Sequence, residues 1–181
     1  FIMIDYSLSL ENVTKIFGRR LIFKDINYNF TSGNVYGIAG SNGSGKSTLA
    51  RIILGIISAT KGKVLHTCNS KKVEDEELHN YIGFVAPYLN LYDEFTAEEN
   101  LIHFSNIRGM EYDKTRAEDL LNRFNILERK NDYVKAYSSG MKQRMKFIFS
   151  LLHKPQLLLF DEPTSNLDNK GKDEVYKIIE E

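Results

Sequence analysis

Residues 40–48, GSNGSGKST, combine glycine, lysine and hydroxyl side chains at a spacing suited to phosphate binding. They match G-x-x-x-x-G-K-[ST], the pattern of a glycine-rich loop that leads from a strand into a helix. Without Cβ atoms, such a loop can surround an anion with backbone N–H groups, and the helix N-terminus adds the positive end of its dipole. We therefore predict a phosphate-binding loop that consists of Gly40, Ser41, Asn42, Gly43, Ser44, Gly45, Lys46, Ser47 and Thr48.

Two side chains of this loop have individual roles in such a site. The Lys46 ammonium would contact the β- and γ-phosphates, and the Ser47 hydroxyl would take one position on Mg²⁺. A flexible loop that matches the pattern by chance is the alternative. A strand pattern before the loop and a helix pattern after it favour phosphate binding.

Two adjacent carboxylates follow an apolar run later in the chain. In LLLFDEP, residues 157–163, a strand is expected to end at Asp161 and Glu162. Asp161 is placed to hold Mg²⁺, and Glu162 is placed to orient or deprotonate an attacking water. Considered without the glycine loop, these residues are explained equally well by an ordinary acidic turn. Their occurrence together with the phosphate-binding loop favours the catalytic interpretation.

Strand and helix patterns alternate around these residues. Apolar and polar side chains alternate between residues 3 and 30, as at Ile26, Tyr28 and Phe30, which predicts a small antiparallel sheet. Short apolar runs predict further strands at NVYGIA, KVLH, IGFVA and LLLF, of which the first and the last are expected to be buried. KSTLARIILGI predicts the helix that follows the loop.

Residues 88 to about 136 have helical patterns and form a predicted insert. Thr96 and Glu99 make a capping box at the start of TAEENLIHFSNIRG, and TRAEDLLNRF predicts a second helix. A third helix begins near SSGMKQR, and GKDEVYKIIEE predicts a closing one. One face of the third helix is apolar and is expected in the core: Met141, Met145, Ile148, Phe149 and Leu152. The predicted fold class is α/β, a mostly parallel core interrupted by an all-α insert.

Composition limits the possible classes of protein. The 181 residues are 42% hydrophobic and 27% charged, as in a soluble globular domain, and 24 basic residues balance 24 acidic ones. A net charge of zero disfavours a dedicated nucleic-acid binder, so no nucleic-acid partner is expected. The single Cys68, the absence of a signal-peptide pattern and the absence of an apolar run of roughly 20 residues predict a cytoplasmic chain without a membrane span.

A third motif identifies the family that the chain resembles. YSSGM, residues 137–141, begins a helix before the acidic strand, where the ATP-binding subunits of ABC transporters usually have LSGGQ. The order of glycine loop, helical insert, YSSGM, DE strand and SNLD resembles that family over essentially the whole chain. The resemblance implies one ABC-type domain. Its P-loop NTPase core and antiparallel β subdomain would comprise residues 1–87 and 155–181, and its helical subdomain would comprise residues 88–154.

The resemblance also implies how the site is completed. ATP with Mg²⁺ would lie between two identical or different subunits paired head to tail, with the loop of one facing Ser138, Ser139 and Gly140 of the other. Asp168 would line the seam between the subunits, and Phe17 would stack on adenine. A buried strand aromatic is the alternative for Phe17. Because the chain has no guanine-reading [NT]KxD motif, ATP is favoured over GTP.

Pro87 departs from the family pattern, because a glutamine that contacts Mg²⁺ and the attacking water usually stands there. Proline has no side-chain donor or acceptor and no N–H. Tyr88, Asn90 or a water would have to substitute, or coupling to the membrane partner differs in this chain. These alternatives stay open at this point.

Two further departures concern the signature segment and the end of the chain. Tyr137, Ser139 and Met141 replace leucine, glycine and glutamine, and SSGMKQR resembles the form found in export-type ATPases. The family usually has a γ-phosphate histidine after the acidic strand, and none of the four histidines here follows Asp161. The sequence therefore resembles a family member truncated before that histidine, and we expect hydrolysis by these 181 residues to be impaired.

The main hypothesis is the ATPase motor subunit of an ABC transporter, with an inclination towards export. It would dimerise on ATP and drive a separate membrane permease through residues 88–136, at the inner face of the cell membrane. A soluble ABC ATPase that acts on ribosomes or DNA is one alternative, disfavoured by the single phosphate loop, zero net charge and short insert. A nucleotide-binding regulatory module without turnover is another, motivated by Pro87 and the missing histidine.

Overall fold

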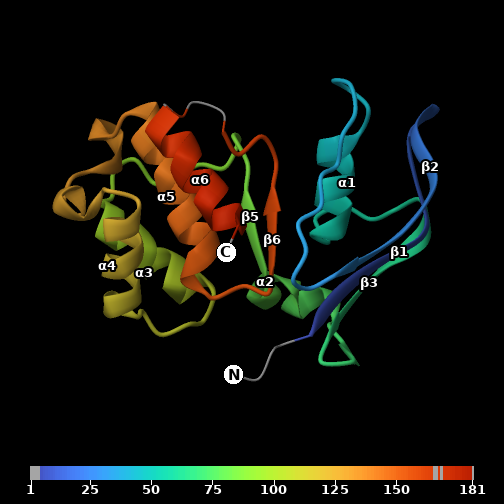
Figure 1. Ribbon diagram of the computed structural model, residues 1–181, viewed down its shortest axis with the longest axis horizontal. Helices are drawn as coiled ribbons and strands as arrows, with labels where there is room; N and C mark the ends of the chain where they lie inside the picture. The colour runs from blue at the N-terminus through green and yellow to red at the C-terminus, as the bar shows by residue number, and fades with distance from the viewer. Residues whose placement is uncertain (1–4, 165–166, 168, 181) are drawn as a thin grey trace. The chain divides into compact units, whose positions relative to one another are not determined.

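The first of two compact units contains a four-stranded antiparallel sheet (Figure 1). The computed structural model describes residues 5–164, 167 and 169–180, and the units are Phe1–Ile82 and Gly83–Glu181. In sheet order the strands are β2 (Arg20–Thr31), β1 (Tyr6–Phe17), β3 (Lys61–Cys68) and β4 (Lys71–Lys72). Alternate β1 side chains, Tyr6, Leu8 and Leu10, are buried. The antiparallel sheet expected near the N-terminus is confirmed, and KVLH joins it as part of β3.

Helix α1, Lys46–Ile53, follows the glycine loop as expected and lies against one face of this sheet (Figure 1). His66 on β3 connects the two layers, because its Nε2 donates to the Ile53 carbonyl at 2.9 Å and its Nδ1 accepts from the Tyr6 hydroxyl at 2.8 Å. A carbonyl can only accept, so the ring proton lies on Nε2. The C-terminal end of α1 is thereby fixed to β1 and β3.

The strand expected at NVYGIA is not formed, which corrects the sequence-based interpretation. Residues 34–41 have no regular secondary structure, and Val35, Tyr36 and Ile38 are exposed. A strand requires a neighbouring strand that pairs with its N–H and C=O groups. In the part of the chain that the structure describes, the two sheets are formed by other segments, so the apolar run lacks such a neighbour.

The second unit has a two-stranded parallel sheet covered by helices (Figure 1). Strand β5 (Ile82–Val85), which begins at the last residue of the first unit, pairs with β6 (Leu157–Phe160). The four long helices are α3 (Ala97–Ile107), α4 (Lys114–Arg123), α5 (Ser139–Leu152) and α6 (Asn169–Glu180). Shorter helices are η1 (Asp75–Glu77) and α2 (Leu78–Tyr81) in the first unit, and η2 (Leu127–Arg129) and η3 (Val134–Ala136) in the second. All four long helices lie where the sequence predicts them.

The core of the second unit is centred on α5. Both α3 and α4 pack against this helix, and the Phe104 ring meets the Phe149 ring edge to face with centroids 4.7 Å apart. Met145, Ile148 and Leu152 of the predicted apolar face are buried, whereas Met141 and Phe149 are partly buried at its border. LLLF is also only partly buried, contrary to expectation. Its single neighbour among the described strands is β5, which leaves the other edge of β6 uncovered by sheet.

The predicted division of the chain at residues 87 and 155 stays a prediction. Along the sequence, the boundary between the two compact units falls between Ile82 and Gly83, and β6 and α6 belong to the second unit. No helix among the described residues combines the length and the apolar character that crossing a membrane requires.

Candidate functional site

The glycine loop has a left-handed backbone at two glycines, Gly43 and Gly45. Gly45 has φ +98°, in the left-handed region, and a Cβ there would lie 2.6 Å from Cγ2 of Ile22. A Cβ on Gly40 would lie 2.6 Å from the Ser44 hydroxyl oxygen. Gly43 also has positive φ, at +79°, but faces open space. The loop therefore needs glycine at position 45 for close packing and for backbone conformation, and at position 43 for backbone conformation.

The N-terminus of α1 is suited to binding an anion. Its N-cap is Gly45, which has no side chain to satisfy the first N–H groups of the helix. Lys46 folds back over the loop, and its ammonium donates to the carbonyls of Gly40 at 2.9 Å and Ser41 at 3.1 Å. Ser47 and Thr48 lie half-buried in the first turn. Backbone donors, a helix dipole and one ammonium thus converge at a largely exposed loop.

The acidic pair lies at the carboxyl end of β6. Asp161 is held by its backbone, whose N–H donates to the carbonyl of Val85 at 2.9 Å. Glu162 is exposed and has φ +50°. A left-handed backbone costs a residue other than glycine roughly 1–2 kcal/mol. Such strain is concentrated at functional positions in proteins, which agrees with the predicted catalytic role of Glu162.

The YSSGM segment forms the N-terminus of α5. Ser138 is the N-cap, and its hydroxyl oxygen accepts from the Met141 N–H at 3.2 Å, which leaves its O–H to donate. Ser138 and Ser139 are exposed, and Gly140 is half-buried. Tyr137 is buried, and its hydroxyl donates to the Arg129 carbonyl at 2.8 Å. Tyr137 thus replaces the usual leucine with a side chain that also anchors the start of the helix.

Four other residues that the sequence suggested for the site have different outcomes. Phe17, at the end of β1, is 49% exposed, which excludes the alternative of a buried strand aromatic. The Lys15 ammonium lies 4.7 Å from the centre of its ring. Asp168 lies outside the described residues. Tyr88 and Asn90, considered as substitutes for the missing glutamine, are both exposed in the loop after β5.

Two residues of α5 were missed by the sequence analysis. The buried Lys146 donates to the carbonyl of Pro87 at 2.6 Å and to that of Ala86 at 3.4 Å. Gln143, one turn earlier, donates from Nε2 to the carbonyl of Pro163 at 3.1 Å. The available signal was a lysine within the apolar run MKFIF. A charge in a stretch expected to be buried indicates a specific partner.

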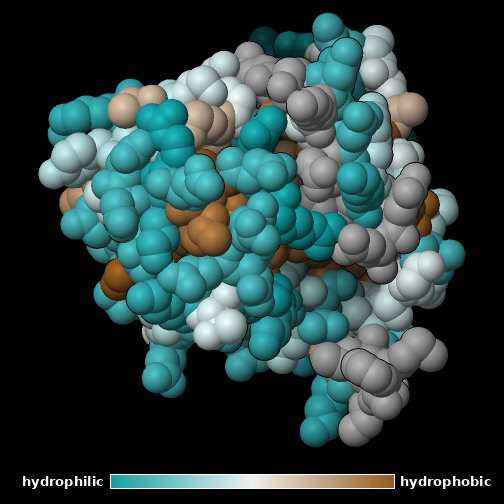
Figure 2. Space-filling model, turned by 60° about the vertical axis from the view of Figure 1, so that its left-hand side comes forward, coloured by the Kyte–Doolittle hydropathy of each residue, from teal (hydrophilic) through white to brown (hydrophobic). Residues whose placement is uncertain are grey.

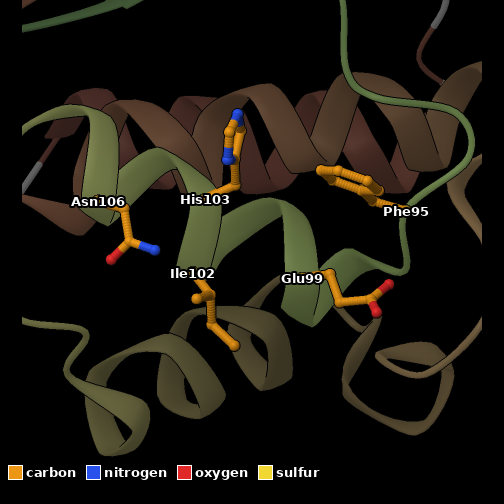
Figure 3. Close-up of a pocket in the computed structure, with 5 residues that line it drawn as sticks. All are labelled: Phe95, Glu99, Ile102, His103 and Asn106. Carbon is orange, nitrogen blue, oxygen red and sulfur yellow. The ribbon is translucent and has the colours of Figure 1, made fainter.

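The helical unit also has two hollows beside α3. One, of about 280 Å³, is lined mainly by apolar side chains such as Leu89, Phe104 and Phe149, with Lys146 at its wall. The other, of about 240 Å³, lies between the turn that precedes α3 and the helix itself (Figure 3), with these lining residues: Phe95, Glu99, Ile102, His103 and Asn106. Hydrophilic residues cover most of the face shown in Figure 2, and hydrophobic surface is confined to small patches.

Comparison with known proteins decides what these features belong to. The sequence profile of the ABC transporter family matches residues 23–165, from within β2 to three residues beyond the acidic pair. The chain belongs to the ABC transporter family. It corresponds to the ATP-binding subunits of that family, whose ligand is ATP with Mg²⁺, and it has their P-loop NTPase fold.

Relatives of known name support this ABC assignment. The Nod factor export ATP-binding protein I of Bradyrhizobium diazoefficiens is 36% identical over 92% of this chain and 55% of its own length. The lantibiotic transport ATP-binding protein SrtF of Streptococcus pyogenes is 34% identical over 96% of this chain and 73% of its own. A dimeric ATP-binding cassette, MJ0796 bound to ADP and Pi, superposes with TM-score 0.79 at 28% identity, covering 95% of this chain and 81% of that one.

The ABC chain described here spans little more than half the length of several of these relatives, for example 53% and 57% of two from Bacillus subtilis. Its predicted site residues are distributed over both compact units. The glycine loop and Phe17 belong to the first unit, and the acidic pair and the YSSGM segment belong to the second. Each group of expected residues lies at the end of a helix or strand: the glycine loop at the start of α1, Phe17 at the end of β1, the acidic pair after β6 and the YSSGM segment at the start of α5.

Proposed function

We propose that this ABC chain binds ATP with Mg²⁺ through its glycine loop and acts as the ATPase motor of a transporter. The observation that carries the proposal is the loop itself. Its helix N-cap position, Gly45, accepts only glycine, and the next residue is a lysine whose ammonium donates to the loop carbonyls. A triphosphate would replace those carbonyls as the partner of Lys46. Ser47 and Asp161 provide the hard oxygen donors that Mg²⁺ prefers.

Hydrolysis would require the second unit. We assign Glu162 to the attacking water, because it is an exposed carboxylate next to the magnesium ligand Asp161. Ser138, Ser139 and Gly140 would bind the γ-phosphate of ATP held by a second subunit, through the Ser138 hydroxyl and the N-terminus of α5. Asp168 and Phe17 keep their predicted roles at the subunit seam and against adenine.

The partner we infer is an integral membrane permease, contacted through residues 88–136, with the subunit at the cytoplasmic face of the membrane. The apolar hollows beside α3 support this segment as a contact surface. Export is the favoured direction, because the name of one relative states Nod factor export. The SSGMKQR form of the signature segment agrees with that direction.

Equilibrium binding of ATP with Mg²⁺ tests the central proposal. Lys46→Ala is expected to weaken ATP binding by at least about tenfold, since it removes a charge-assisted contact worth roughly 1.5–3 kcal/mol. Lys71→Ala is the matched control, because it removes an exposed lysine of β4 and changes the net charge by the same amount as Lys46→Ala. This variant should bind ATP like the wild type. Equal ATP affinity of the Lys46→Ala variant and the wild type would refute phosphate binding by the loop.

A further inference from the structure

Helix α5 reaches the carboxyl ends of both strands of the parallel sheet through side chains three residues apart. Gln143 donates to the carbonyl of Pro163, which follows the acidic pair after β6. Lys146 donates to the carbonyls of Ala86 and Pro87, which follow β5. Because residues three apart lie on one face of a helix, a single face of α5 holds both strand ends.

The chemistry of Lys146 is unusual for a side chain that serves only packing. It is 9% exposed, and burial lowers the pKa of its ammonium. The two acceptors, at 2.6 and 3.4 Å, are neutral main-chain carbonyls. A buried charge with neutral partners is costly, and an apolar side chain of similar volume is often at least as stabilising at such a site. Stability therefore does not account for a lysine here.

The carbonyls that Lys146 holds are continuous with the support of the acidic pair. Val85, the residue before Ala86, accepts the hydrogen bond from the Asp161 N–H at 2.9 Å. Of these three consecutive residues, Val85 thus bonds to Asp161, and Ala86 and Pro87 bond to Lys146. A displacement of the loop after β5 would be transmitted to the backbone of Asp161 through this single strand end.

A second lysine holds the far part of the same loop. The Lys142 ammonium lies 2.7 Å from Oδ1 of Asp93, one helical turn before Lys146. Both side chains of this pair are more exposed, at 31% and 52%. An exposed ion pair contributes only about 0–1 kcal/mol, so the buried Lys146 is the stronger of the two connections.

We propose that Lys146 is a positioning residue, which holds the loop at Pro87, and through Val85 the Asp161–Glu162 turn, in register with the YSSGM segment at the start of α5. The assignment rests on the proposed ATPase function. Proline has no side-chain hydrogen-bonding group, so its carbonyl is what the loop offers to a donor at this position. In this chain the connection between loop and helix runs through the main chain of Pro87 and a lysine from α5.

Steady-state ATP hydrolysis by the full-length protein carrying Lys146→Met tests the assignment. We expect kcat to fall about tenfold while KM for ATP stays within about twofold, since misplacing a catalytic group affects the transition state far more than binding at the glycine loop. The melting temperature should stay equal or rise, because a buried charge is removed. A purely structural role would instead lower stability and kcat together.

Two matched variants complete the test. Lys142→Met removes the exposed ion pair on the same face and should change kcat less than about twofold. Lys146→Arg keeps donors for both carbonyls and should retain most of kcat. Unchanged kcat in Lys146→Met would overturn the assignment, as would an Arg variant as slow as the Met variant. Because ATP affinity is measured alongside, failure of ATP to bind the wild type would refute the proposed function instead.

Discussion

Single residues of the glycine loop are determined by two separate constraints, backbone conformation and close packing. Gly43 meets only the first, because its φ is positive but no atom lies within 4 Å of an added Cβ. Gly45 meets both, because the same Cβ would collide with Ile22 of β2 and approach Phe23 at 3.0 Å. Substitutions at these two glycines can therefore distinguish the free-energy cost of backbone strain from that of a steric clash.

Gly45→Ala is expected to destabilise the folded chain by about 2–3 kcal/mol, the sum of left-handed strain and overpacking. Gly43→Ala should cost only about 1 kcal/mol, from strain alone. Urea unfolding of the two variants at one temperature measures the difference. Equal destabilisation of both variants would show that β2 does not pack against the loop at Gly45.

Among single residues, those that belong to a motif could be predicted from the sequence, whereas the residues that hold the motifs in place could not. The loop, the Thr96 capping box and the start of a helix near SSGMKQR depend on local spacing, and all three are present in the structure. Lys146 depends on its proximity to Pro87, a residue 59 positions away in the chain. No local pattern encodes such a contact, because it arises only when α5 packs beside β5.

Elements of the first unit are joined by the His66 side chain, which makes their packing sensitive to pH. Burial lowers the pKa of His66 below its ordinary value of 6.5, while its hydrogen bond to Ile53 acts in the opposite direction with less effect. The unfolded chain therefore takes up a proton on this histidine before the folded chain does. Stability is complete above about pH 6.5 and is lost as the pH falls towards the lowered folded pKa.

We expect the urea midpoint of the wild type to fall between pH 8 and pH 5.5, and the His66→Gln variant to show a smaller pH dependence over the same interval. Both side chains can hydrogen-bond, but only histidine titrates in this range. The comparison of the two pH differences removes any constant cost of the substitution. An identical pH dependence in both proteins would show that the linkage does not arise from His66.

The N-terminus of α3 is stabilised by a capping box, which can be tested by substitution. The Thr96 hydroxyl oxygen accepts from the Glu99 N–H at 3.1 Å, and the Glu99 carboxylate accepts from the Thr96 N–H at 2.8 Å. Thr96→Ala should destabilise the second unit by about 1 kcal/mol, whereas Thr96→Ser keeps the cap and should be nearly neutral. Thermal unfolding distinguishes them; equal melting temperatures for the Ala and Ser variants would contradict the role of the cap.

Helices were predicted more reliably than strands, for a physical reason. The hydrogen bonds of a helix lie within one segment, so the periodicity and caps of α3, α4 and α5 contain most of the information. A strand depends on a partner that the segment itself does not specify. NVYGIA and LLLF were read from similar apolar runs, yet only LLLF has a paired neighbour among the described residues, in β5.

For the whole molecule, the proposed ATPase would require two subunits, because the glycine loop of one would need the YSSGM segment of another. ATP would then hold the dimer together, and hydrolysis of the γ-phosphate would release it. Differential contacts with ATP and ADP are the only source of free energy for such a switch. A variant that binds ATP but cannot cleave it should therefore accumulate as the dimer.

Glu162→Gln in the full-length protein supplies that variant, since the amide keeps the shape of the side chain but cannot act as a base. With ATP and Mg²⁺ we expect a stable dimer by size-exclusion chromatography with light scattering, and a monomer with ADP. The double variant Lys46→Ala with Glu162→Gln is the control and should stay monomeric with either nucleotide, because the dimer requires the bound γ-phosphate. A Glu162→Gln protein that binds ATP but stays monomeric would contradict a site shared between subunits, and would favour ATP acting within one chain.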